Sequence, residues 1–180
     1  MRAFALLAIL PFSFTALAAD LESRVLTHYV PQDLLETAVR TEGWTEITLN
    51  VKGGVRKDDT VRIWTGGLID RGNGDQPGVN VNGPSGVDAV QAPPDPASLA
   101  LSSDPKHAYA ILFKTESAGP HKPLPPGKPF EIKLTKDKEK LWIGFNDEKG
   151  RYHDNHLGKG KRHEHDPMWL RIEVVRTIVD

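Results

Sequence analysis

The sequence of 180 residues contains no cysteine. This absence excludes a disulfide scaffold, a zinc site built on thiolates and a cysteine nucleophile. The sequence also has no large excess of positive or negative charge. Its 24 Asp and Glu side chains nearly balance its 23 Lys and Arg side chains, for a formal net charge of −1. We therefore expect no nucleic-acid binding and no attachment to anionic membranes through bulk charge.

No apolar run is long enough to cross a bilayer. The most apolar stretch, residues 3–16, follows Arg2, contains Pro11 and leads to an Ala-Leu-Ala site at 16–18. A basic start, a short apolar segment and a small-x-small site are typical of a secretory signal peptide. The pattern predicts a signal peptide over 1–18, a periplasmic or secreted protein, and no transmembrane anchor.

Alternation of apolar and polar residues is the main structural signal in the remainder. A period of two residues indicates half-buried strands, and a short continuous apolar run indicates a central strand. The alternating segments are 46–51, 61–64, 130–134, 141–145 and 170–175, and the continuous run is 108–114. Clusters of Gly, Pro, Asn and Asp separate these segments, as expected of turns.

The only predicted helix spans 31–40, where Pro31 suits the first turn and an apolar stripe begins at Leu34. Antiparallel strands with one polar face need a second sheet to cover the other face. The sequence therefore predicts an all-β fold, a single-domain two-sheet antiparallel β-sandwich or jelly roll, with at most one short N-terminal helix. The sandwich is expected over 46–180, after an extension at 19–45 that supplies an edge strand or short helix.

Two loops are candidates for chemistry. The first, 66–75, is rich in glycine, which lets backbone carbonyls approach a ligand. In the second loop, 145–155, Asp147, Asp154 and Asn155 offer hard oxygen atoms. Oxygen ligands are what calcium prefers, although the spacing is not that of an EF-hand. From the residues alone, either a calcium site or an ordinary surface turn fits this loop.

Taken in order, several segments resemble the LecA-type galactophilic lectin family of calcium-dependent, galactose-binding-like β-sandwiches. They are KDDTVRI at 57–63, GG at 66–67, NGPSG at 82–86, AYAILFK at 108–114, PGK at 126–128, and the loop at 145–155. Their order and spacing cover roughly 45–175. In the family, an N-D-x-x-G-x-Y-x-N-N segment holds most of the calcium ligands, and residues 146–155 match it except for Asp154.

The resemblance implies five metal ligands. Asp147, Asp154 and Asn155 would ligate Ca²⁺ through their side chains, and Arg71 and Arg151 through their backbone carbonyls. The same three side chains would bind the carbohydrate. The implied function is a lectin-like protein, not an enzyme, in which Ca²⁺ bridges loop oxygens and sugar hydroxyls. A homo-oligomer is compatible with this function.

Two features of the sequence differ from the pattern of the lectin family. The family's galactose-binding His and Gln fall near Val90 and Pro93, so galactose specificity does not carry over. In addition, four histidines crowd into and beside an insertion at 156–167: His153, His156, His163 and His165. Imidazoles bind Zn²⁺ and similar ions, so a histidine-rich transition-metal protein is one alternative. A β-sandwich domain accessory to glycan hydrolysis is another, although no pair of carboxylates stands out.

Overall fold

The computed structural model describes residues 22–71, 81–86, 95–123, 127–157 and 166–178. The predicted signal peptide therefore lies outside the described residues. The elements in chain order are β1 (Glu22–Tyr29), α1 (Gln32–Arg40), β2 (Thr45–Ile47), β3 (Thr60–Gly66), β4 (Ile69–Asp70), β5 (Val81–Asn82), η2 (Pro96–Ser98), η3 (Pro105–His107), β6 (Ile111–Thr115), β7 (Phe130–Lys133), β8 (Leu141–Phe145), η4 (Tyr152–Asp154) and β9 (Trp169–Ile178).

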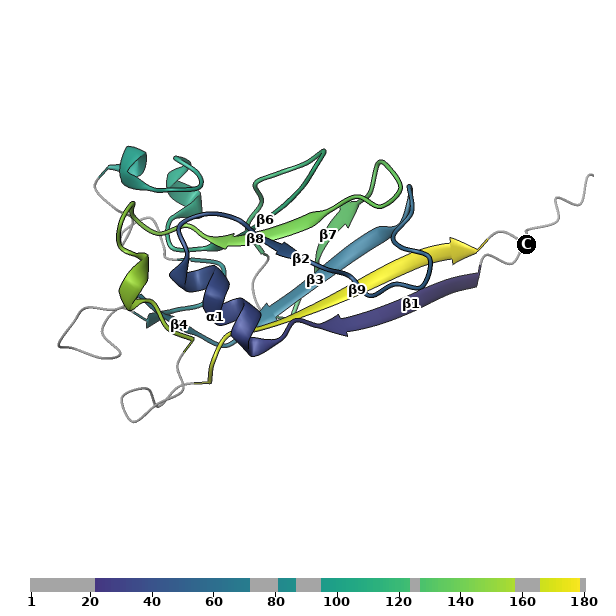
Figure 1. The fold of residues 1–180 in the computed structure, drawn as a ribbon, viewed down its shortest axis with the longest axis horizontal. Helices are drawn as coiled ribbons and strands as arrows, with labels where there is room; N and C mark the ends of the chain where they lie inside the picture. The colour runs from purple at the N-terminus through teal and green to yellow at the C-terminus, as the bar shows by residue number, and fades with distance from the viewer. Residues whose placement is uncertain (1–21, 72–80, 87–94, 124–126, 158–165, 179–180) are drawn as a thin grey trace, which may run out of the picture.

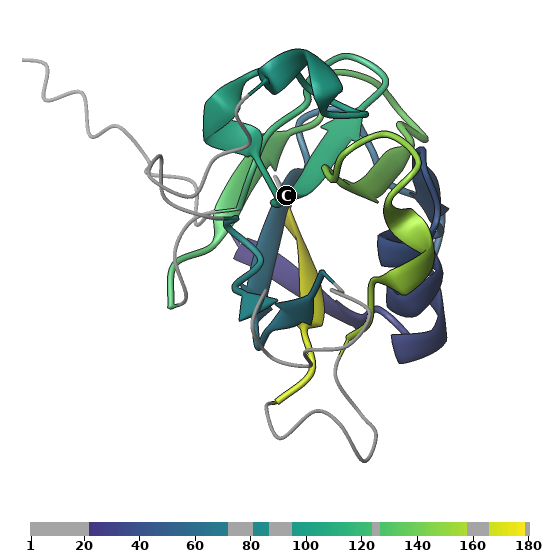
Figure 2. The same ribbon diagram turned by 90° about the vertical axis from the view of Figure 1, so that its left-hand side faces the viewer.

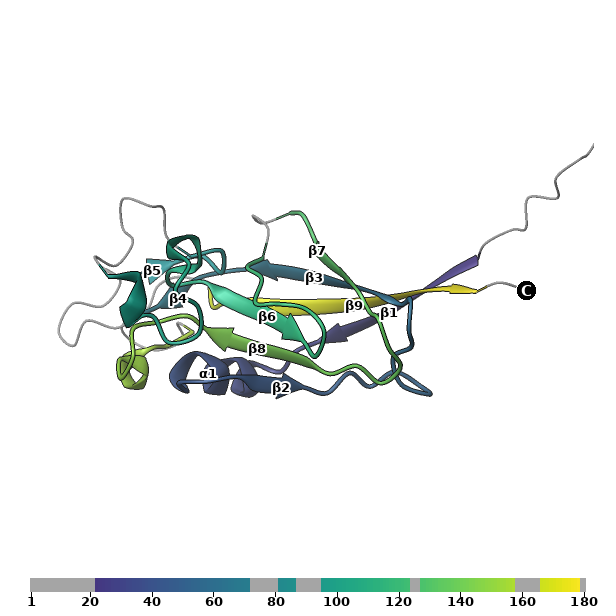
Figure 3. The ribbon, with the colours of Figure 1, turned by 90° about the horizontal axis from the view of Figure 1, so that it is seen from above.

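The strands form two main antiparallel sheets, ordered β1-β9-β3-β7 and β2-β8-β6, and a small β4-β5 ribbon (Figures 1 and 3). The prediction of an all-β antiparallel sandwich with one short N-terminal helix is confirmed, whereas jelly-roll connectivity stays a prediction. Within the described ranges, no helix is long and apolar enough to span a membrane.

The core lies between the two sheets. Alternate residues of the central strands point into it, and the largest fully buried side chains include Ile63, Phe113, Ile143, Phe145 and Ile172. Burying each such side chain stabilises the fold by about 1.5–3 kcal/mol relative to exposure. Helix α1 contributes the apolar stripe expected of it, packs against β8 and β9, and closes one side of the sandwich (Figure 1).

Strand β2 is shorter than the predicted 46–51 segment. The chain leaves the sheet after Ile47 and turns, with Val51 N–H donating to the Leu49 carbonyl at 2.8 Å. Gly53 and Gly54 follow with φ of 80° and 75°, a left-handed backbone that glycine adopts without strain. Leu49 and Val51 still pack against the core after the strand ends, which explains why the apolar alternation outlasts the strand.

A buried ion pair fixes the end of the sandwich farthest from β4. Asp59, 2% exposed, accepts hydrogen bonds from Arg176 Nη2 at 2.7 Å, Arg176 Nε at 2.9 Å and Arg56 N–H at 2.8 Å. Burial alone would raise the pKa of Asp59, but these donors outweigh it and lower that pKa. The pair therefore stabilises the fold above about pH 4, and its contribution is lost as the pH falls below that value.

We expect Arg176→Met to lower the free energy of unfolding by about 2–4 kcal/mol, because it leaves the Asp59 carboxylate buried without its partner. The measurement is urea denaturation at pH 7. Lys133→Met is the matched control, since it removes an exposed ion pair with the neighbouring Asp58 and should cost under about 1 kcal/mol. Equal losses in the two variants would contradict a stabilising role for burial of the Asp59 pair.

Candidate functional site

The 145–155 loop is held in place by Asn146, the first residue after β8. Asn146 is fully buried, and its Oδ1 accepts from the N–H groups of Leu101 and Ser102 at 2.9 and 3.0 Å. Its Nδ2 donates to the carbonyls of Ser102 and His107, both at 2.9 Å. Both the oxygen and the nitrogen of the Asn146 amide are therefore fully hydrogen-bonded, and these bonds connect the 145–155 loop to the 101–107 segment. Figure 2 looks onto this end of the molecule.

Asp147, the next residue, carries a buried carboxylate that is only 4% exposed. Its Oδ1 accepts from the Glu148 N–H at 2.7 Å and its Oδ2 from Asn155 Nδ2 at 2.8 Å. Burial raises the pKa of Asp147 to about 6, and the two hydrogen bonds and the Arg71 charge only partly oppose that effect. The donors and the positive charge around the Asp147 carboxylate therefore do not fully offset the cost of burying its negative charge.

Asn155 is fully buried, and two acceptors fix the orientation of its amide. Its Nδ2 donates to Asp147 Oδ2 and also to the Val39 carbonyl at 2.9 Å, so its Oδ1 must face the other way. That Oδ1 is buried and has no hydrogen-bond partner, and the same holds for Oδ1 of the preceding Asp154. A buried oxygen without a donor costs about 1–3 kcal/mol, and a cation would satisfy it.

Arg71 reaches the same end from the glycine-rich loop. It follows β4, where Asp70 and His156 exchange backbone hydrogen bonds of 2.9 and 2.8 Å. The Arg71 guanidinium lies 3.9 Å from the centre of the Tyr109 ring, and its charge acts on Asp147. Tyr109 in turn donates to Glu148 Oε1 at 2.7 Å. The structure therefore brings the beginning of the 66–75 loop beside the 145–155 loop, while residues 72–75 lie outside the described part.

Arg151, the fifth predicted ligand, lies on the exposed tip of the loop. Its N–H donates to the Glu148 carbonyl at 3.1 Å, and its side chain lies 3.9 Å from Glu148 Oε2. The loop that carries it is closed by Tyr152, whose hydroxyl donates to the Phe145 carbonyl at 2.7 Å. The ligand roles assigned to the carbonyls of Arg71 and Arg151 stay predictions.

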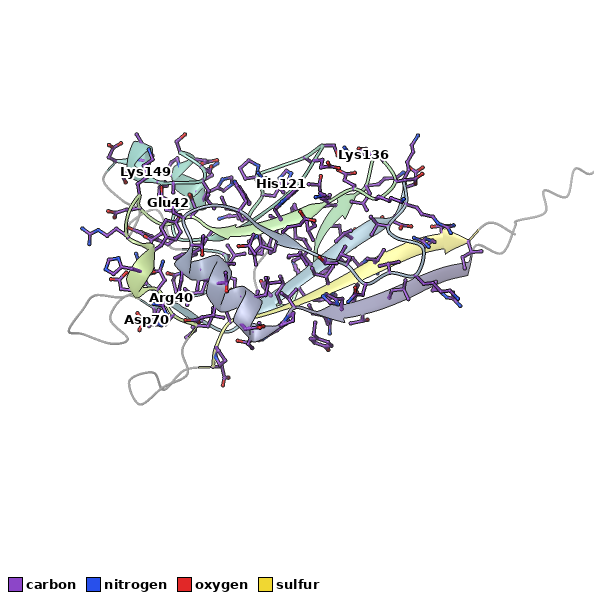
Figure 4. All side chains as sticks on the ribbon, in the orientation of Figure 1. Arg40, Glu42, Asp70, His121, Lys136 and Lys149 are labelled. Atoms are coloured by element: carbon purple, nitrogen blue, oxygen red, sulfur yellow. The ribbon has the colours of Figure 1, made fainter. Side chains whose placement is uncertain are left out.

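Helix α1 and the residues after it supply partners that the sequence did not indicate. Glu36 Oε2 accepts from the Leu157 N–H at 3.0 Å, Arg40 Nη2 donates to the His153 carbonyl at 3.1 Å, and Glu42 Oε2 accepts from the Gly150 N–H at 2.8 Å. Figure 4 shows Arg40, Glu42 and Asp70 at this end of the molecule. The N-terminal extension therefore supports the candidate site.

Asn82 is a second buried polar group that sequence reasoning did not single out. Its Nδ2 donates to the carbonyls of Gly83 and Tyr109, each at 2.8 Å, and its Oδ1 is buried without a partner. It lies in β5, opposite Ile69 of β4. Its only sequence signal was its place in the NGPSG segment.

The predicted histidine cluster is described only in part. His156 Nδ1 lies 3.2 Å from Glu36 Oε1 and His153 is exposed, whereas His163 and His165 lie outside the described residues. In the part of the chain that is described, no group of three or more His, Cys, Asp and Glu could hold a metal. The predicted calcium set has two carboxylates, one amide oxygen and two carbonyls, so it differs in kind from such a group.

No protein-family model matches the chain, and no curated protein is significantly similar to it. The likeness to LecA-type lectins therefore rests on the segments quoted from the sequence.

In the presence of a chelator, we expect the Asp147 carboxyl to titrate near pH 6. Because its pKa of about 6 exceeds the value of about 4 in the unfolded chain, the folded state binds the extra proton between these pH values. The free energy of unfolding should therefore gain roughly 2–3 kcal/mol from this group as the pH falls from about 6 to 4. Urea denaturation across that range measures the effect.

Asp147→Asn should abolish this gain, whereas Asp58→Asn, at a carboxyl that is 64% exposed, should leave it in place. A pH dependence that is identical in the wild-type protein and in Asp147→Asn would contradict the raised pKa.

Proposed function

We propose that this protein binds Ca²⁺ at Asp147, Asp154 and Asn155 and, through the ion, binds a carbohydrate. The observation that supports the proposal most strongly is that Asp154 and Asn155 each carry a buried oxygen without a hydrogen-bond partner, and that the amide nitrogen of Asn155 donates to the buried carboxylate of Asp147. Hard oxygen atoms in need of a positive partner suit calcium better than zinc or copper.

The charges of the site agree with a divalent cation. Asp147 and Asp154 would together neutralise Ca²⁺, and a bound cation would lower the pKa of Asp147 and keep it ionised. Calcium takes six to eight oxygen ligands, more than the five that the chain is expected to offer. The remaining positions would accept vicinal hydroxyl groups of a sugar, while the carboxylates of Asp147 and Asp154 would orient that sugar by hydrogen bonds.

The proposal gives the chain no catalytic role. As an exported, periplasmic or secreted lectin-like protein, it would retain a glycoconjugate without converting it. Single shallow sites of this kind bind one sugar weakly, and presentation of several sites together raises the avidity by orders of magnitude.

Calcium should stabilise the wild-type protein. At a concentration of about 100 Kd, we expect the free energy of unfolding to rise by about 2.7 kcal/mol relative to EGTA. For a domain of this size the Tm should rise by roughly 5–10 °C. Asp147→Asn and Asp154→Asn should lose this response, whereas Glu46→Gln, which breaks an exposed ion pair with Lys140, should keep it.

Further measurements with and without metal ions distinguish calcium-dependent sugar binding from the two alternative functions. Retention on a glycan array in Ca²⁺ but not in EGTA would support a lectin, and release of cleaved products would indicate hydrolysis instead. Stabilisation by Zn²⁺ alone, abolished in His163→Ala with His165→Ala, would favour the transition-metal alternative. A Tm that millimolar Ca²⁺ does not change would contradict the proposed function.

A further inference from the structure

Strand β1 is the outer strand of the four-stranded sheet (Figures 1 and 3). It pairs with β9 in unbroken register from Glu22↔Ile178 to Tyr29↔Arg171, and no described strand pairs with its other edge. Its eight residues include no proline, no lysine and no bulge, and its two charged residues, Glu22 and Arg24, lie near its N-terminal end. Proteins use those three devices to prevent an edge from pairing with another chain.

The other described sheet edges are protected. β7 has four residues and presents the exposed Glu131 and Lys133, and β2 has only three residues. The run at 108–114 was predicted to be a central strand, but β6 is the outer strand of its sheet. Its edge is covered, because Phe113 and His121 exchange two backbone hydrogen bonds of 2.8 Å. Among the described edges, β1 is thus the longest, and its residues 25–29 include no proline, no bulge and no Asp, Glu, Lys or Arg.

The hydrogen-bond alternation identifies the groups that face outward. Val30 N–H donates to the Leu170 carbonyl at 3.0 Å, so even-numbered residues of β1 direct their backbone groups toward β9. In an antiparallel pair the alternate residues point the opposite way. Val25, Thr27 and Tyr29 therefore present their N–H and C=O groups at the free edge.

The side chains of the same three residues lie on the outer face of the sheet. Leu26 and His28 stand opposite Val174 and Ile172, which are buried in the core, and successive side chains alternate between faces. Val25 and Tyr29 are 48% and 66% exposed, among the few large hydrophobic side chains in the described residues that are so open. The edge therefore combines free backbone groups with uncovered apolar surface.

We propose that two copies of this chain associate by antiparallel pairing of their β1 strands about a two-fold axis at Thr27. This register pairs outward-facing residues with outward-facing residues, and its three facing pairs would exchange about six backbone hydrogen bonds. It sets Tyr29 opposite Val25 of the second copy, twice, and aromatic residues opposite β-branched residues stabilise sheets. Arg24 falls opposite Val30, so no like charges face each other.

A second copy suits this edge because the register about Thr27 is self-complementary: it sets Tyr29 of each copy opposite Val25 of the other, and Arg24 of each copy opposite Val30 of the other. One strand pair buries less than a standard interface, so we expect a weak, reversible dimer. The inference does not depend on calcium or sugar binding. If the proposed site is also correct, the dimer would carry two copies of it and gain avidity.

The absence of cysteine from the chain makes a cross-linking test unambiguous. In Thr27→Cys the two thiols would face each other across the axis, with Cα atoms about 5.5 Å apart, a separation that a disulfide spans. Under mild oxidation we expect a covalent dimer at least about tenfold faster than in Lys133→Cys, whose exposed site is on β7. Equal rates in the two variants would overturn the proposal.

Analytical ultracentrifugation from micromolar to near-millimolar concentration tests the unmodified interface. Wild-type protein should show a concentration-dependent dimer, and Val25→Lys should remain monomeric with an unchanged circular dichroism spectrum, because a lysine on an edge strand opposes pairing. A wild-type monomer throughout, or a dimer that survives in Val25→Lys, would overturn the proposal.

Discussion

The hydrogen bond from Asn155 Nδ2 to the Asp147 carboxylate is the contact on which the candidate site depends. The same nitrogen also donates to the Val39 carbonyl, so one amide joins the segment after β8, the residue after η4 and helix α1. Asn155 is fully buried and Asp147 is 4% exposed, so neither can exchange this partner for bulk water. The direction of the Asn155 Oδ1 follows from this contact, and that oxygen is buried without a hydrogen-bond partner.

The two buried aspartates of the fold make an instructive contrast. Asp59 receives three donors, two of them from the Arg176 guanidinium, and its pKa is lowered. Asp147 receives two neutral donors, and its pKa is raised to about 6. The first carboxylate is compensated within the protein and serves stability. The second is compensated incompletely, as is common where a protein binds a ligand or carries out chemistry.

The sequence predicted most of the fold because the strands depend on local alternation. Helix α1 was predicted to within one residue from Pro31 and its apolar stripe. Strand β2 was predicted too long, because Leu49 and Val51 continue the apolar pattern against the core after the chain has left the sheet at Ile47. Jelly-roll connectivity is a property of how distant strands connect, which alternation does not encode.

The candidate site was predictable only in part, because a local sequence pattern does not indicate contacts between residues that are distant in the chain. Asp147, Asp154 and Asn155 lie within one short segment, so a local motif can indicate them together. The residues that hold this segment, Val39, Glu36 and Glu42, are separated from their partners by 116, 121 and 108 positions. Nothing local marks such contacts, and the raised pKa of Asp147 likewise arises from burial that only the assembled sandwich provides.

Calorimetric titration of the protein with Ca²⁺ at pH 6, in two buffers of different ionisation enthalpy, tests the proposed calcium site most directly. With a pKa of about 6, Asp147 carries a proton in about half of the molecules at that pH, and binding must displace it. We expect release of about half a proton per Ca²⁺ at pH 6 and close to none at pH 8. No heat of binding, or binding without proton release at pH 6, would contradict calcium ligation by Asp147.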